Sequence, residues 1–344
     1  NYTWGKVNER TQMLSSYLSK FINEGDRVIL LFPNNNFFIE SILACFYAKI
    51  IPVPVEVPKN RNDLNKLENI IKDCNPEYVI TESSSFNKSK YLENFKLVET
   101  IFVNELVLEI DFKKPSATIE DIDIALIQYT SGSTANPKGV VISHKNLMHN
   151  LSTISVEVNS HNQTIGVFWL PFFHDMGLFG TVFSIIYCSG RGIYMKPYEF
   201  IREPLLWLKI ISDFSATATV SPNFAFDLVC DKYERTKRNS YDLSSLDTVL
   251  NGSENISGDT LNRFYNLFKK FKFNLNAFTP CYGMAECSLY ISGETSFSTD
   301  SIIYLDVQEL KSKNVKIVNK NSKYSNPYVS CGQSGSKDSI IIYN

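Results

Sequence analysis

The chain has 344 residues, a length typical of about two packed domains. Hydrophobic residues make up 44% of it and charged residues 20%, an ordinary globular composition that excludes intrinsic disorder. Its 34 basic and 36 acidic side chains leave a formal charge of −2, so electrostatics favours neither nucleic acid nor an anionic membrane as a partner.

The cysteines and the apolar stretches indicate the cellular compartment of the protein and whether it crosses a membrane. The seven cysteines are odd in number and form no C-x-x-C pair, which favours a reduced, cytoplasmic protein. None of them pairs with a histidine at zinc-ligand spacing. The most apolar stretch, Met176 to Gly190, contains glycines and is shorter than the roughly 20 residues of a membrane-spanning helix. We therefore expect no membrane span.

Helical and strand-like patterns alternate along the first part of the chain. The expected elements are a helix at 7–21, a strand at 28–32, a helix from an Asn34–Asn36 cap to Ala48, a proline-containing edge strand at 51–55, a helix at 63–74 and a strand at 78–81. Apolar strands separated by helices at this spacing predict an α/β fold with a mainly parallel sheet.

A polar segment at 111–123 follows, and the alternation then resumes. Strands are expected at 124–129, 164–170, 191–195, 216–221 and 248–251, and helices at 146–156, 177–188, 204–214, 224–232 and 259–271. A charged loop is expected at 233–245, and short strand-like pieces at 302–304, 315–317 and 339–343. These changes divide the chain into a first α/β subdomain at 1–120, a second at 121–293 and the start of a β-rich subdomain at 294–344.

A run of hydroxyl and glycine residues at 130–134 follows an apolar strand and leads into Pro137, Lys138 and Gly139. Such residues add little to a core, but their N–H groups and hydroxyls can bind an anion, to which Lys138 adds a positive charge. The run is not a Walker A loop, because Lys138 is followed by glycine rather than Ser or Thr. A polar hairpin turn is the alternative.

Two other motifs are weak when taken alone. Tyr282-Gly283-Met284-Ala285-Glu286 joins an aromatic ring, a glycine and a carboxylate, but a strand-to-helix turn has the same residues. His174-Asp175 precedes an apolar segment, where Asp175 can simply cap a helix.

Together and in this order, the three motifs resemble those of the adenylate-forming superfamily of acyl- and aryl-CoA synthetases and adenylation domains. The phosphate loop of that superfamily resembles Thr130-Ser131-Gly132-Ser133-Thr134 with Pro137-Lys138-Gly139, and its adenine-side motif resembles Asn251-Gly252-Ser253-Glu254 with residues 282–286. Trp169-Leu170-Pro171, residues 174–178 and Ser221-Pro222-Asn223-Phe224-Ala225 make the chain most similar to the fatty acyl-AMP ligases.

The resemblance implies two stacked α/β subdomains, with mainly parallel sheets and helices between and outside them, and the start of a smaller, barrel-like β-rich subdomain. The ribose-binding aspartate, the insertion and the mobile C-terminal lid of the family do not follow Asn344. We therefore expect the chain to be the N-terminal, substrate-binding portion of a larger enzyme, poorly active alone.

The resemblance also implies a two-step reaction. A fatty acid carboxylate attacks the α-phosphate of ATP and releases pyrophosphate, and the acyl group then passes to the phosphopantetheine thiol of an acyl carrier protein. Lys138, His174 and Glu286 are the implied catalytic residues. The implied cofactors are ATP and Mg²⁺, the metal being held by Glu286 and Thr134.

The implied nucleotide contacts fall into two groups. Phosphate binding is implied for Thr130, Ser131, Gly132, Ser133, Thr134, Lys138 and Gly139, and adenine binding for Gly252, Ser253, Glu254, Tyr282, Gly283 and Met284. His174 would lie where the acyl carboxylate meets the thiol. The helix at 177–188 would form a wall of the acyl tunnel, with plain core packing as the alternative.

Two other functions remain open from the sequence. The chain could belong to an acyl-CoA ligase or an amino-acid adenylation domain. It could also be a non-catalytic nucleotide or lipid binder, which is favoured by Ala135 at a loop position where the family usually has glycine.

Overall fold

The computed structural model describes residues 2–92, 95, 97–106, 118–130, 137–236, 240–295, 297–335 and 340. The chain forms two compact units. Unit 1 comprises Asn1–His149 and Pro171–Leu178, and unit 2 comprises Asn150–Leu170 and Phe179–Asn344. Both units combine helices with mainly parallel sheets, which confirms the predicted α/β class. The subdomain boundaries after residues 120 and 293 stay a prediction.

Unit 1 is built on a four-stranded parallel sheet in the order β2-β1-β3-β4. Its strands are β1 (Arg27–Leu31), β2 (Ile51–Val55), β3 (Tyr78–Thr81) and β4 (Glu99–Phe102). β2 is an edge strand, as Pro52 and Pro54 predicted, because proline has no N–H group to donate to a further strand. Beside β2 lies a separate antiparallel hairpin of β5 (Ile124–Thr130) and β6 (Lys138–Ser143).

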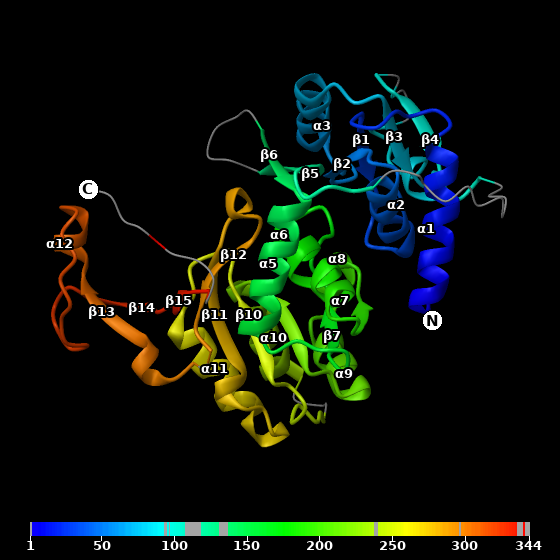
Figure 1. The fold of residues 1–344 in the computed structure, drawn as a ribbon. Helices are drawn as coiled ribbons and strands as arrows, with labels where there is room; N and C mark the ends of the chain where they lie inside the picture. Colours follow the sequence, from blue (N-terminus) through cyan, green and yellow to red (C-terminus); the bar gives the residue numbers. More distant parts are fainter. Residues whose placement is uncertain are drawn as a thin grey trace. The chain divides into compact units, whose positions relative to one another are not determined.

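Helices cover the sheet of unit 1. They are α1 (Trp4–Leu18), α2 (Asn36–Tyr47), α3 (Arg61–Cys74) and the short α4 (Ser83–Phe86). One face of α3 carries Leu64, Leu67 and Ile71, which are buried in a core cluster with Ile29 and Leu31 of β1. α2 packs on the sheet as well, and α1 packs against α2 (Figure 1).

Unit 2 is built on a seven-stranded sheet in the order β15-β12-β11-β10-β9-β7-β8 (Figure 1). Its strands are β7 (Ile165–Phe168), β8 (Arg191–Tyr194), β9 (Ala218–Ser221), β10 (Thr248–Asn251), β11 (Phe278–Gly283), β12 (Tyr290–Gly293) and β15 (Gln333–Ser334). The strands β8, β7, β9, β10 and β11 are parallel, so their carboxyl ends lie at one edge of the sheet. The strands β12 and β15 pair antiparallel to their neighbours.

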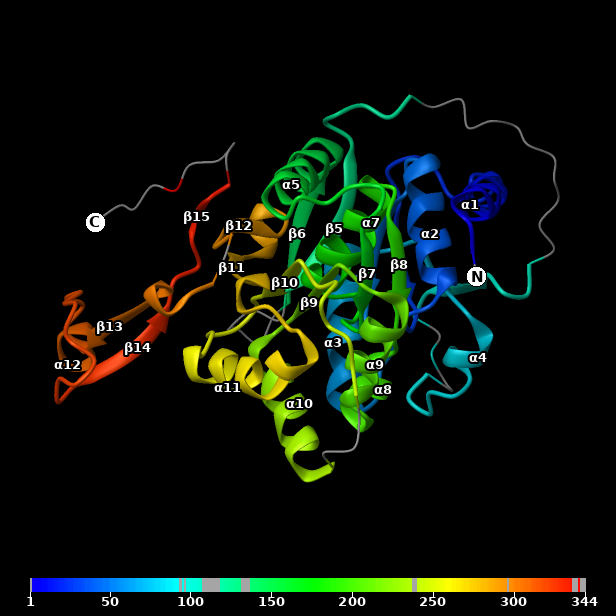
Figure 2. The ribbon, with the colours of Figure 1, turned by 90° about the horizontal axis from the view of Figure 1, so that it is seen from below.

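Aromatic packing joins the helices of unit 2 to its sheet. Phe226 contacts Trp207, Phe264 and Phe278, with ring centroids 5.2–5.8 Å apart. These rings come from three helices and β11, and Figure 2 shows α10 and α11 side by side. The helices of unit 2 include α8 (Pro197–Arg202), α9 (Leu205–Phe214), α10 (Asn223–Thr236), α11 (Gly258–Phe268), η2 (Lys269–Phe271), η3 (Leu275–Ala277) and η4 (Ala285–Cys287). The helix α5 (His144–Glu157) begins in unit 1 and belongs to unit 2 from Asn150 onward.

After the last residues of β12, the chain forms η5 (Thr299–Ser301) and an antiparallel pair of β13 (Ile302–Asp306) and β14 (Ser325–Val329). The connection between these two strands contains α12 (Val307–Lys311). The strand expected at 315–317 is wrong, because only Ile317 pairs, in an isolated bridge with Leu305. Most of the strand expected at 339–343 lies outside the described residues.

The helix expected at 177–188 is confirmed as a continuous helical segment from 175 to 187, but it is not a regular α-helix. The segment consists of α6 (Asp175–Gly177), a π-helix η1 (Leu178–Phe183) and α7 (Ser184–Tyr187). The Ser184 hydroxyl donates a hydrogen bond to the Phe179 carbonyl, five residues earlier, at 2.7 Å. This bond gives that carbonyl a partner where the regular α-helical pattern is interrupted.

The loop expected from residue 233 begins later than predicted, because α10 continues to Thr236. Tyr233 is buried and its ring lies 4.9 Å from that of Phe268, so tertiary packing extends the helix. In the described parts of the chain, no helix is both long enough and apolar enough to cross a membrane.

Candidate active site

The ends of the predicted phosphate loop are paired strand residues. Thr130 of β5 lies opposite Lys138 of β6, and Tyr129 lies opposite Gly139. A Cβ atom at Gly139 would come within 2.8 Å of Ile127 Cγ2 and 3.0 Å of Tyr129 Cζ. Glycine at this position therefore lets the Tyr129 ring lie across β6. The predicted loop residues Ser131, Gly132, Ser133 and Thr134 lie outside the described residues.

A hydrogen bond connects this hairpin to α3. The Tyr129 hydroxyl donates to a carboxylate oxygen of Asp73. Burial of the ring and the bond to Asp73 both raise the pKa of Tyr129 far above its usual value, so the hydroxyl remains a donor at any physiological pH. The strand that leads into the predicted phosphate loop is therefore fixed to a helix of the unit 1 core.

The segment that carries His174, at 171–178, is bonded to the rest of unit 1 at two places. The backbone N–H of Phe172 donates to Asn34 Oδ1 at 3.0 Å, and Gln128 Nε2 donates to the Phe173 carbonyl at 2.8 Å. Gln128 is buried in β5, two residues before Thr130. The structure thus brings two predicted site segments together, the start of the phosphate loop and the residues around His174.

His174 and Asp175 form an ion pair with Nδ1 and Oδ1 2.7 Å apart. The Met176 N–H is 2.6 Å from Asp175 Oδ1 and 3.3 Å from His174 Nδ1, so we assign it to the carboxylate and the Nδ1 proton to the His174–Asp175 bond. Burial lowers the pKa of His174, but the hydrogen bond and charge of Asp175 raise it by more. In the neutral ring this arrangement leaves Nε2 as the acceptor.

Two buried polar side chains end parallel strands of unit 2 without a partner in the described structure. Asn251, at the carboxyl end of β10, is 0% exposed, and both of its amide atoms lack hydrogen bonds. The Trp169 indole N–H, just beyond β7, is also unpaired. Unpaired buried polar groups are costly, and the carboxyl edge of a parallel sheet is where α/β proteins bind ligands. These residues therefore fit a ligand with polar groups, such as a nucleotide.

The predicted adenine-side loop starts directly after Asn251. A Cβ atom at Gly252 would lie 3.0 Å from Cys281 Sγ, so glycine allows a close approach to β11. Ser253 adopts a left-handed φ of 68°. Glu254 Oε1 accepts a hydrogen bond from the Phe224 backbone N–H at 2.7 Å. This last contact joins the loop to α10, and nothing in the sequence pattern indicated it.

The second adenine-side motif forms a tight turn. β11 ends at Gly283, where a bulge interrupts its pairing with β12. A Cβ atom at Gly283 would lie 2.0 Å from the Leu289 carbonyl oxygen, so only glycine fits. The Met284 N–H donates to the same carbonyl at 2.9 Å. The turn leaves the Tyr282 ring 54% exposed and places Glu286 in η4, also exposed.

The arrangement of the side chains that could bind a metal ion limits the kind of metal site in the described part of the chain. Among the described residues, no three His, Cys, Asp or Glu side chains gather closely enough to hold a metal ion. Mg²⁺ bound with nucleotides usually takes one or two carboxylates, phosphate oxygens and water. The single exposed carboxylate of Glu286 fits that pattern, and the second predicted ligand, Thr134, lies outside the described residues.

Comparison with known proteins identifies the family. The AMP-binding enzyme family matches residues 1–327. The chain is 29% identical to the medium-chain-fatty-acid–[acyl-carrier-protein] ligase JamA of Moorena producens over 96% of its own length and 57% of that protein. It is 30% identical to the long-chain-fatty-acid–AMP ligase FadD32 of Mycolicibacterium smegmatis over 99% of the chain and 55% of that protein.

A solved structure supports the same relationship. The fatty acyl-adenylate ligase from Legionella pneumophila, in complex with acyl adenylate and pyrophosphate, superposes with a TM-score of 0.87 at 34% identity, over 97% of this chain and 58% of that one. The chain thus spans little more than half the length of these relatives. A match over nearly the whole chain, together with the motif-bearing turns described above, shows that the chain belongs to the AMP-binding enzyme family.

Proposed function

We propose that the chain is the N-terminal part of an enzyme that activates a fatty acid with ATP. The products of the first step are the acyl-adenylate and pyrophosphate, and the acyl group then passes to the thiol of an acyl carrier protein. The observation that carries the proposal is the pairing of the predicted phosphate-loop strand with the His174 segment through Gln128 and Phe173. The similarity to JamA and FadD32, both fatty-acid ligases, supports the choice of substrate, and JamA, an acyl-carrier-protein ligase, supports the choice of acceptor.

The first step joins two anions, so positioning and charge neutralisation account for most of its catalysis. Lys138 supplies a positive charge at the start of β6, where an ammonium can attract phosphate oxygens. The N–H groups of the loop from Thr130 to Gly139 would donate to the β- and γ-phosphates. The exposed Tyr282 ring would stack on adenine. Mg²⁺, held by Glu286 and Thr134, would neutralise phosphate charge.

His174 would act at the acyl carboxylate. Its ring is held by Asp175 at Nδ1, so Nε2 can accept a hydrogen bond or a proton. We place it where the carboxylate is activated and where the carrier thiol later arrives. We further propose a cytoplasmic location, which agrees with seven free thiols in the structure.

The decisive experiment measures pyrophosphate release by the full-length gene product with ATP, Mg²⁺ and a series of fatty acids. We expect release that depends on the fatty acid, and acyl transfer to a phosphopantetheinylated carrier protein in preference to CoA. Lys138→Ala should lower the rate by roughly 100-fold or more. Lys145→Ala, which removes an exposed lysine from α5, is the matched control.

No release with any fatty acid would contradict the proposal. Release with an amino acid, or transfer to CoA alone, would replace it with one of the two enzyme alternatives. ATP binding without turnover in the full-length protein would favour a non-catalytic binder.

A further inference from the structure

The first residues of α10 and the segment that leads into α11 are joined by two hydrogen bonds. Glu254, in the loop before α11, accepts from the N–H of Phe224 at the start of α10. Asn223, the first residue of α10, accepts from the N–H of Ser257, the N-cap of α11, at 3.0 Å. Each helix start thus receives a side-chain acceptor from the other segment, which pairs N–H groups that an isolated helix would leave without partners.

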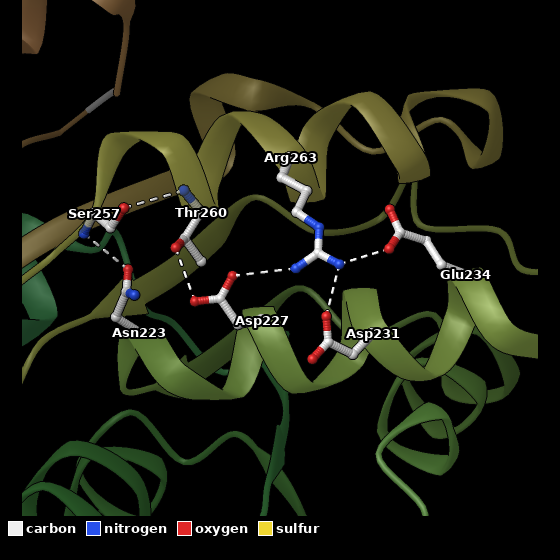
Figure 3. A network of polar contacts seen from close by, with 7 residues as sticks. All are labelled: Asn223, Asp227, Asp231, Glu234, Ser257, Thr260 and Arg263. Carbon is white, nitrogen blue, oxygen red and sulfur yellow. Dashed lines mark hydrogen bonds and ion pairs between the residues drawn. The ribbon is translucent and has the colours of Figure 1, made fainter.

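A row of polar contacts continues this connection along the two helices (Figure 3). The Thr260 hydroxyl donates to Asp227 Oδ2 at 2.9 Å. Arg263 then bridges α11 to three carboxylates of α10, at 2.6 Å to Glu234, 2.7 Å to Asp231 and 3.6 Å to Asp227. These contacts and the buried Phe226–Phe264 pair hold α10 and α11 together.

The loop between Asn251 and Ser257 is the segment predicted to frame adenine. It is bonded to the start of α10 at Glu254 and again at Ser257, so it cannot shift without breaking contacts to that helix. The bond from the Phe224 N–H to Glu254 Oε1 directs this carboxylate toward the start of α10. The same bonds flank Gly252, whose missing Cβ allows the close approach to Cys281, and Ser253 with its left-handed backbone.

We propose that Glu254 is a positioning residue. It holds the adenine-side loop in its binding conformation by capping α10, with Asn223 as the reciprocal arm, and it does not contact the base. The inference rests on the proposed function only in taking ATP as the nucleotide.

The test is nucleotide affinity measured by calorimetry on the full-length protein, which needs no turnover. Glu254→Ala should weaken ATP and GTP binding by the same factor, roughly 3- to 10-fold, because an exposed cap is worth the lower part of the usual range. Preference for ATP over GTP should therefore be unchanged. Glu254→Gln keeps an acceptor oxygen and should bind nearly as the wild type does.

Asn223→Ala should reproduce the Glu254→Ala effect, and the double variant should lose less than the product of the two single losses, since both arms hold one loop. If Glu254→Ala does not fold, the preference of Glu254→Gln for ATP over GTP tests whether the carboxylate contacts the base, and Asn223→Ala tests whether the contacts to α10 hold the loop. Asp306→Ala is the matched control, because Asp306 caps α12 with a carboxylate remote from this loop in sequence, accepting from Gln308 N–H at 2.9 Å. Its nucleotide affinity should be unchanged.

A lowered preference for ATP over GTP in Glu254→Ala would overturn the inference, because it would mean that the carboxylate reads the base. Unchanged affinity in both single variants would overturn it as well. Failure of the proposed function would look different: the wild type would bind ATP without releasing pyrophosphate, and the comparison of variants would remain valid.

Discussion

Tyr129 and Asp73, 56 positions apart in the sequence, are joined by a hydrogen bond from the tyrosine hydroxyl to the aspartate carboxylate. Tyr129 immediately precedes Thr130, where the predicted phosphate loop begins, and Asp73 lies in the last turn of α3. Because α3 is part of the unit 1 core, the bond fixes one end of the loop to a rigid element.

Removing this bond tests its contribution. Tyr129→Phe should lower the free energy of unfolding by about 1 kcal/mol, since the hydroxyl is only partly buried and the acceptor is charged. Urea denaturation measures the change, and Asp73→Asn in a double-mutant cycle isolates the pair. Tyr198→Phe, on a ring that is 70% exposed, is the control and should have little effect. Additive losses in the cycle would show that the two side chains do not interact.

The buried carboxylate of Glu40 offers a stability prediction. Its side chain is 3% exposed and accepts from Arg10 Nε at 2.8 Å across α1 and α2. Arg10→Leu should destabilise the protein by about 2 kcal/mol, because it leaves a buried charge without its partner. The double variant with Glu40→Met should recover most of that loss in the same denaturation assay. A double variant as unstable as Arg10→Leu would refute this account.

Protonation of His174 gives a pH prediction. Asp175 raises its pKa, so the folded state favours the charged ring. The pair therefore contributes its full stability below the unfolded value of about 6.5 and loses it as the pH rises through the higher folded-state pKa. In Asp175→Asn only the effect of burial would remain, and the pKa of His174 should fall. NMR titration of the imidazole protons measures this, with the other histidines as internal references. An unchanged titration midpoint for His174 in Asp175→Asn would contradict the conclusion that Asp175 raises its pKa.

Gly283 tests the turn that holds Tyr282 and Glu286. Gly283→Ala would place a Cβ atom against the backbone oxygen of Leu289, which cannot move away as a side chain could. We expect a loss of about 2 kcal/mol or more, as for other forced backbone shifts, measured by thermal denaturation. Gly5→Ala is the control, because in α1 the nearest atom to its Cβ would be 3.9 Å away and alanine favours a helix. Equal melting temperatures for wild type and Gly283→Ala would show that the turn can relax.

The amino-acid sequence by itself determined the local features of this protein. The period of Leu64, Leu67 and Ile71 predicts the face of α3 that is buried, and Asn35 caps α2 by accepting from the Phe38 N–H. Pro52 and Pro54 place β2 at the sheet edge. The three motifs were readable for the same reason, since phosphate- and adenine-binding turns are short segments whose glycines and hydroxyls are adjacent in the chain.

Only the tertiary structure decided which distant residues meet. The bonds of Gln128 to Phe173, Tyr129 to Asp73 and Phe224 to Glu254 link positions 30 or more residues apart, and no periodicity encodes such pairs. The π-helix after Gly177 and the extension of α10 to Thr236 also departed from the local pattern. In both places packing and hydrogen bonding supply more free energy than the few tenths of a kcal/mol, roughly, by which helix propensities differ.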